Sequence, residues 1–137
     1  MAYLTKLENS RVYVLRITTA DNLVIHKIGM CNTSRVTDRM MEILRSWFCS
    51  YRYVPTTKLL LNINCVEARC VEAYIHRLLK PLAFAYERKT DGSTEMFCNV
   101  NEHRLLWFIR GLDNSMQTIP AVTDEQVIKL SEWLSNG

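Results

Sequence analysis

The chain has 137 residues, enough for one domain built around one hydrophobic core. Hydrophobic residues make up 48% of the sequence and charged residues 23%, an ordinary mixture that excludes a disordered or fibrous protein. Every apolar run is far too short to cross a bilayer, and the first residues lack the layout of a signal peptide. We therefore expect one cytoplasmic domain over residues 1–137, in a bacterium or in the host cell of a virus or phage.

Net charge and cysteine content leave the class of function open. The net charge of +3 permits a polyanionic partner but does not by itself indicate one. The five cysteines are scattered, and no pair has the two-residue spacing of a zinc knuckle or a redox motif. We expect reduced thiols, most of them buried.

The first half of the chain has the pattern of a hairpin followed by a helix. Residues 11–17 and 23–28 are rich in β-branched and aromatic side chains and predict two antiparallel strands, with turn-forming residues between them. Gly29 is expected to end the second strand. From about Ser34, apolar residues recur every three or four positions and predict a helix, capped by Thr33 or Ser34.

The second half begins with another strand and helix and then becomes helical. Residues 58–64 predict a third strand, and residues 66–79 predict a second helix that Pro81 ends. The remaining elements are a short segment at 95–98, a helix from Asn101 to Leu112, and a last helix that opens with a capping box of Thr123 and Gln126.

This order of elements predicts the α+β class. We expect a small, mostly antiparallel, three-stranded sheet flanked by helices, with an extra C-terminal helix. The core of the domain would span about 10–112 and the helical extension about 121–136. The sequence contains neither repeats nor low-complexity segments, which favours one domain.

Four short motifs occur in a fixed order between residues 12 and 97. They are Val12-Tyr13-Val14 with Lys27-Ile28-Gly29, then Arg39-Met40, then Glu72-x-x-x-His76, and finally Glu95-Met96-Phe97. Their order resembles the motifs of GIY-YIG endonucleases, in particular the T5orf172-type domain of phage and viral proteins. The resemblance covers about two thirds of the chain.

The resemblance implies a GIY-YIG-type fold and a metal-dependent endonuclease that hydrolyses DNA. It implies these catalytic residues: Tyr13, Lys27, Arg39, His76 and Glu95. Glu95 would be the ligand of one Mg²⁺, for which Mn²⁺ would substitute.

The sequence departs from the family pattern in three places. Val12 stands where the family has Gly, and Lys27 stands where many members have a second Tyr. Arg39 lies one or two residues later than the pattern requires, so Arg35, one helical turn earlier, is an alternative catalytic arginine.

Physical chemistry gives these residues compatible roles. If the hairpin turn centres on Ala20, Tyr13 and Lys27 are directly opposite each other, with Cβ atoms about 5 Å apart. A nearby cation favours the phenolate form of a tyrosine, so Tyr13 could help deprotonate the attacking water while Lys27 and Arg39 position water and phosphate. A Mg²⁺ ion on one carboxylate keeps its waters, binds phosphate oxygens and stabilises the leaving oxygen.

Each of these residues also has an ordinary structural role. Tyr13 could pack in the core, Lys27 could be an exposed edge-strand charge, and Glu72 with His76 could form a helix-surface pair. We expect His26 and His103 to be structural.

The alternative function is a catalytically weakened module of the same fold that binds nucleic acid or a host protein. A groove for nucleic acid would be lined by basic residues, namely Arg35, Arg45, Arg52, Arg69, Arg77, Lys80, Arg88 and Lys89. Among them lie Tyr51, Tyr53 and Tyr86, which could stack on bases. The expected partners are DNA and either a second copy of the chain or a larger DNA-targeting protein, with no membrane.

Overall fold

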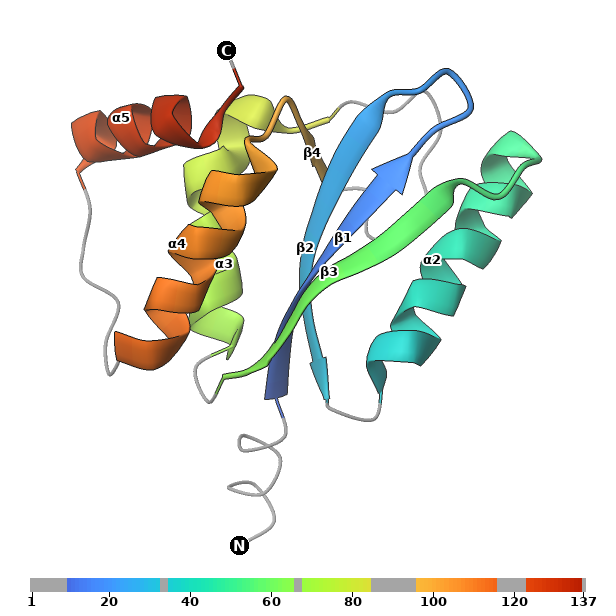
Figure 1. Ribbon diagram of the computed structural model, residues 1–137, viewed down its shortest axis with the longest axis horizontal. Helices are drawn as coiled ribbons and strands as arrows, with labels where there is room; N and C mark the ends of the chain where they lie inside the picture. The colour runs from blue at the N-terminus through green and yellow to red at the C-terminus, as the bar shows by residue number, and fades with distance from the viewer. Residues whose placement is uncertain (1–9, 33–34, 66–67, 85–95, 116–122, 137) are drawn as a thin grey trace, which may run out of the picture.

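The computed structural model describes residues 10–32, 35–65, 68–84, 96–115 and 123–136. Over these ranges the chain has the predicted α+β class, with an open antiparallel sheet between helices (Figure 1). The elements are β1 (Ser10–Thr18), β2 (Val24–Asn32), α2 (Val36–Tyr51), β3 (Thr56–Asn64), α3 (Ala68–Leu79), a 3-10 turn η2 (Lys80–Leu82), β4 (Met96–Cys98), α4 (Glu102–Ser115) and α5 (Asp124–Leu134).

The sheet contains four strands, in the order β3-β1-β2-β4, instead of the three that we expected. The additional strand is β4, which coincides with the short segment predicted at 95–98. It pairs antiparallel with the stretch of β2 from Ile25 to Lys27. A strand of three residues is too short to show the alternation of apolar and polar residues from which a strand is predicted.

The second strand does not end at Gly29 as predicted. β2 continues to Asn32, and Gly29 pairs with Tyr13 in the middle of the β1–β2 ladder. Glycine inside a strand often marks a close approach by another group, and the site described below contains that group.

The register of the hairpin differs from the expected one by two residues. The loop is closed by a hydrogen bond from the Thr19 amide to the Leu23 carbonyl (2.9 Å), and Asn22 has a φ of 65°. The hairpin is therefore centred on Asp21 and not on Ala20, which places Lys27 opposite Leu15. Tyr13 and Lys27 are therefore diagonal neighbours on one face of the sheet and not a directly opposed pair.

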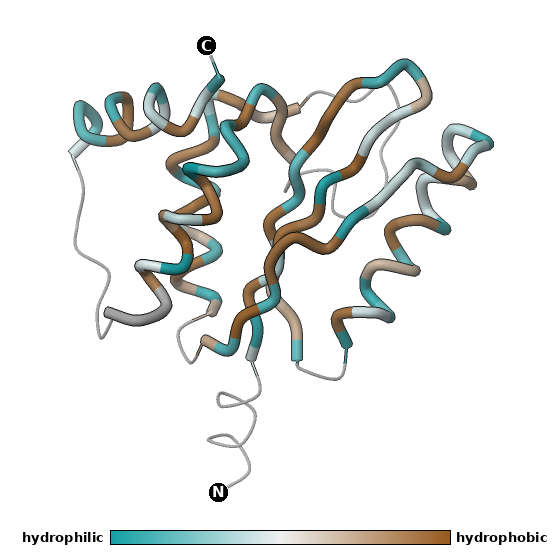
Figure 2. The backbone as a smooth tube through the Cα atoms, viewed as in Figure 1, coloured by the Kyte–Doolittle hydropathy of each residue, from teal (hydrophilic) through white to brown (hydrophobic). Residues whose placement is uncertain are grey.

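The two faces of the sheet carry separate hydrophobic clusters. On one face, the β1 residues Tyr13, Leu15 and Ile17 pack against α2. On the other face, β1 and β2 residues that include Val12 and Ile28 pack against α3, α4 and α5 (Figure 1). The hydrophobic stretches of the strands lie in the middle of the sheet, between these helical layers (Figure 2).

Two of the three predicted helix caps are confirmed. Asn101 accepts a hydrogen bond from the Arg104 amide at 3.2 Å, and Thr123 forms the predicted capping box with Gln126. The cap predicted for the first helix, Thr33 or Ser34, falls outside the described ranges. Arg35 occupies the N-cap position of α2 and makes no side-chain capping bond.

The expected reduced cysteines are confirmed, because all five are free thiols. They are not mostly buried, since Cys49 and Cys70 are exposed and only Cys65 is fully buried. Across the described elements, no helix is long and apolar enough to cross a membrane.

Candidate functional site

The centre of the site is the close approach of Tyr13 to Gly29. The two residues pair across β1 and β2, and Tyr13 is 1% exposed. A Cβ atom built on Gly29 would lie closer than 3.0 Å to the hydroxyl oxygen and to Cζ of Tyr13. The missing side chain at Gly29 thus supplies the space that the phenol occupies.

Lys27 is buried beside this phenol. Its side chain is fully shielded from solvent, and Nζ lies 5.8 Å from the centroid of the Tyr13 ring, within the range of a cation–π contact. Lys27 is not the exposed edge charge of the alternative interpretation, because β4 covers the edge of β2 and Met96 pairs with it. Burial of an ammonium group is costly, so its position next to Tyr13 requires a compensating interaction.

Arg39 reaches the same phenol from α2. Its guanidinium hydrogen-bonds with Tyr13 and with Glu42, and the Arg39 Nη1 to Glu42 Oε2 distance is 2.9 Å. Burial alone would lower the pKa of Arg39, but these hydrogen bonds and the charges of both partners raise it overall. Tyr13, Lys27 and Arg39 therefore converge on one face of the sheet.

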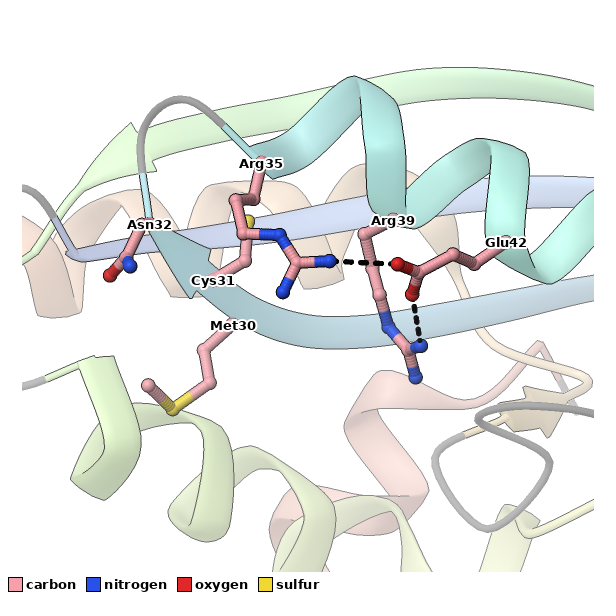
Figure 3. A pocket seen from close by; sticks show the side chains of 6 residues that line it. All are labelled: Met30, Cys31, Asn32, Arg35, Arg39 and Glu42. Carbon is pink, nitrogen blue, oxygen red and sulfur yellow. Dashed lines mark hydrogen bonds and ion pairs between the residues drawn. The ribbon is translucent and has the colours of Figure 1, made fainter.

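Glu42 is a member of the site that the motifs did not reveal. Its Oε1 accepts a hydrogen bond from Arg35 Nη2 at 2.7 Å while its Oε2 binds Arg39, so one carboxylate bridges two guanidiniums (Figure 3). The hydrogen bond from Arg39 lowers the pKa of the Glu42 carboxyl; desolvation opposes this shift, and the charge of Arg35 adds to it. The signal in the sequence was the spacing, because Glu42 follows Arg39 by three positions on one helix.

A pocket of about 310 Å³ opens where β2 ends and α2 begins. It is lined by Met30, Cys31, Asn32, Arg35, Arg39 and Glu42 (Figure 3). Partial burial raises the pKa of the Cys31 thiol, although the charges of Arg35, Arg39 and Arg11 act in the opposite direction. Both candidate arginines thus line this pocket, and Arg39 is the one whose hydrogen bond to Tyr13 is seen.

His76 approaches from the opposite layer. It lies on α3, its Nε2 is 2.7 Å from the carbonyl oxygen of Ile28, and its ring packs beside Phe97 at 5.5 Å between centroids. A carbonyl can only accept, so Nε2 carries the proton in this hydrogen bond. His76 therefore contacts the backbone of the strand that carries Lys27 and Gly29.

Four predicted residues fall outside the ranges that the structure describes: Glu95, Tyr86, Arg88 and Lys89. Met96, the residue after Glu95 in the sequence, pairs with Lys27. In the part of the chain that is described, no group of three or more His, Cys, Asp or Glu side chains could hold a metal ion.

The other predicted nucleic-acid-binding residues lie on both sides of the sheet. Arg45 is exposed on α2, whereas Arg77 is on α3 and forms an ion pair of 3.4 Å with Asp124. Lys80 is exposed in η2. Because α2 and α3 cover opposite faces, Arg45 and Arg77 do not line one groove.

A second polar cluster lies on the face covered by α4. His26 is 3% exposed, and its Nε2 is 3.0 Å from Glu102 Oε1. Glu102 also lies 3.5 Å from the Arg16 guanidinium. This cluster joins strand to helix away from Tyr13.

No family model, no curated protein and no solved structure matches the chain.

Proposed function

We propose that this protein is a metal-dependent endonuclease of the GIY-YIG type that hydrolyses phosphodiester bonds of DNA. The observation that carries the proposal is the convergence of Tyr13, Lys27 and Arg39 beside an arginine-lined pocket. Cations next to a phenol favour its phenolate form, and guanidinium groups bind phosphate oxygens with good geometry. A buried lysine beside a buried phenol serves such chemistry better than it serves stability.

In this proposal each residue has a defined role. Tyr13 takes a proton from the attacking water, and Arg39 holds both the phenol and a phosphate oxygen. Lys27 supplies positive charge beside the ring. The Nε2 atom of His76 is engaged by the Ile28 carbonyl, so any proton transfer by His76 uses Nδ1.

The proposal assigns Mg²⁺ to Glu95, with Mn²⁺ as a substitute. The carboxylate that lines the described pocket, Glu42, is a poor ligand because two guanidiniums already bind it and would repel a cation. One other carboxylate is sufficient, since Mg²⁺ usually keeps several waters and binds substrate phosphates. When bound, the ion would polarise the phosphate and stabilise the leaving oxygen.

A second candidate is a catalytically weakened module that binds nucleic acid or a host protein. The burial of Tyr13 and Lys27 favours this second candidate, because Tyr13 is 1% exposed and Lys27 is 0% exposed. Water reaches such a phenol only if the surrounding layer opens. Arg35, in contrast, lines the pocket and is exposed, so a ligand can approach it without any opening of that layer.

The test is DNA cleavage with Mg²⁺ or Mn²⁺ and with a chelator, for the wild type and for Glu95→Gln. We expect cleavage only with the metal, and we expect Glu95→Gln to abolish it while binding persists and the melting temperature stays within a few degrees. Glu125→Gln, which changes an exposed helical Glu on α5, is the matched control and should cut normally.

Equal cleavage with and without chelator would exclude the one-metal mechanism. Cleavage by Glu95→Gln would mean that another residue binds the metal. Binding of DNA without cleavage under every condition would select the second candidate.

A further inference from the structure

The contact between Glu42 and the two arginines has the form of an occupied anion site. The two carboxylate oxygens each accept a hydrogen bond from a different guanidinium, at 2.7 Å from Arg35 and 2.9 Å from Arg39 (Figure 3). Guanidinium groups bind carboxylate and phosphate in the same manner, through paired N–H donors. Glu42 therefore occupies the donors that a phosphate group would use.

The charge of the pocket supports this interpretation. With Glu42 in place, the three ionised lining residues sum to +1, and with Glu42 withdrawn Arg35 and Arg39 leave +2. The other lining residues are neutral in their ordinary states: Met30, Cys31 and Asn32. An anionic ligand thus gains a stronger field once the carboxylate has moved away.

Glu42 is also placed so that it can leave. Its side chain is 41% exposed and that of Arg35 is 53% exposed, so their contact can break without disturbing the core. Arg39 is less exposed, at 28%, and its hydrogen bond to Tyr13 holds it in place. Exposed ion pairs of this kind contribute little to stability, which makes the exchange of one anion for another easy.

We propose that Glu42 is a built-in competitor that occupies the Arg35–Arg39 pair until a phosphate group of nucleic acid displaces it. This inference rests on the proposed function only in naming nucleic acid as the source of the phosphate. The apparent affinity of the pocket is then reduced by the fraction of molecules in which Glu42 is released. Glu42 makes the pocket selective, because only ligands that bind the two arginines more strongly than its carboxylate does can displace it.

The experiment measures binding without cleavage, in the presence of a chelator, for two probes. One probe is inorganic phosphate and the other is a short fluorescent DNA oligonucleotide. We expect Glu42→Gln to tighten the binding of both probes by about threefold to tenfold, the scale set by exposed ion pairs. Arg35→Gln in the Glu42→Gln background should remove the gain.

Two further variants separate the bridging contact from net charge. Glu125→Gln removes the same charge from an exposed ion pair with Lys129 on α5, and it should leave both affinities unchanged. Glu42→Asp keeps the charge but shortens the side chain, so that it cannot bridge both arginines, and its affinities should lie between those of wild type and Glu42→Gln.

Unchanged or weaker binding by Glu42→Gln, or an equal gain in Glu125→Gln, would overturn the competitor role. Tightening for inorganic phosphate alone would overturn nucleic acid as the source of the ligand. The nuclease proposal fails on a different result, because a protein that binds as described but never cuts DNA refutes only the proposed function.

Discussion

The two faces of the sheet use buried polar groups differently. On the face covered by α2, Tyr13 and Lys27 lie beneath one helix and next to a pocket with two arginines. On the face covered by α3, α4 and α5, the buried His26 is paired with Glu102, and the surrounding cluster is apolar. The first arrangement concentrates charge where a ligand can approach, and the second joins elements together.

This difference separates the contributions to stability and to function. Ile75, Leu78 and Leu105 are completely buried on the three-helix face, and burial of such side chains is the main favourable term in folding. A buried lysine on the other face works against stability. Substitutions on the α2 face should therefore change chemistry most, and substitutions on the opposite face should change the free energy of unfolding most.

The largest expected effect is that of Tyr13→Phe on cleavage. Loss of the hydroxyl should reduce the rate by about 10²–10⁴-fold, because proton transfer by a positioned group contributes that much, while the fold stays intact. The matched control is Tyr74→Phe on the opposite face, where the ring stacks on Phe108 at 6.4 Å. Rates should be measured on protein whose circular dichroism matches the wild type. A wild-type rate for Tyr13→Phe would make Tyr13 a packing residue.

Leu105→Ala should have the largest effect on stability. The side chain is fully buried in the three-helix cluster, and its truncation should cost about 2–5 kcal/mol in urea unfolding. The folded fraction should bind inorganic phosphate with wild-type affinity, because the Arg35–Arg39 pocket lies on the other face. A cost below about 1 kcal/mol would show that this cluster is not the main source of stability.

Gly29→Ala tests the close contact between Gly29 and the Tyr13 ring, and it should lower the free energy of unfolding by less than Leu105→Ala does. The added methyl group must displace the Tyr13 ring inside a packed cluster, which should cost about 1–3 kcal/mol in chemical denaturation. The control is Gly111→Ala, since a Cβ there meets nothing within 4 Å and a helical alanine is favoured over glycine.

A double-mutant cycle sharpens this test. Tyr13→Phe removes the hydroxyl that lies nearest to the new methyl group, so it should recover part of the cost of Gly29→Ala. Strictly additive costs would mean that the methyl group is accommodated elsewhere.

Local signals in the sequence predicted the elements well. The Asn101 cap and the Thr123–Gln126 capping box depend on residues within three positions of one another, and both are confirmed. The second strand was predicted, but its continuation through Gly29 to Asn32 was missed because glycine normally weakens a strand. Here the glycine accommodates the Tyr13 ring from a neighbouring strand. That contact spans sixteen positions and leaves no local pattern.

The same distinction applies to the candidate site. The convergence of Tyr13 and Arg39 followed from the order of motifs, but the burial of Lys27 depends on Met96, which lies far along the chain. The spacing of Glu42 from Arg39 was readable, yet its bridge to Arg35 depends on side-chain direction at the start of α2. Glu95 remains a prediction.

The shortness of β4 bears on how a sealed site exchanges with solvent. Its three residues hold the outer edge of β2, and Met96 belongs to the cluster that encloses Tyr13. Short edge elements open locally at a far smaller free energy than the global transition. Transient release of β4 would uncover Lys27 while β1, β2 and β3 stay paired. The rate at which β4 detaches from β2 would then set how often water reaches the Tyr13 hydroxyl.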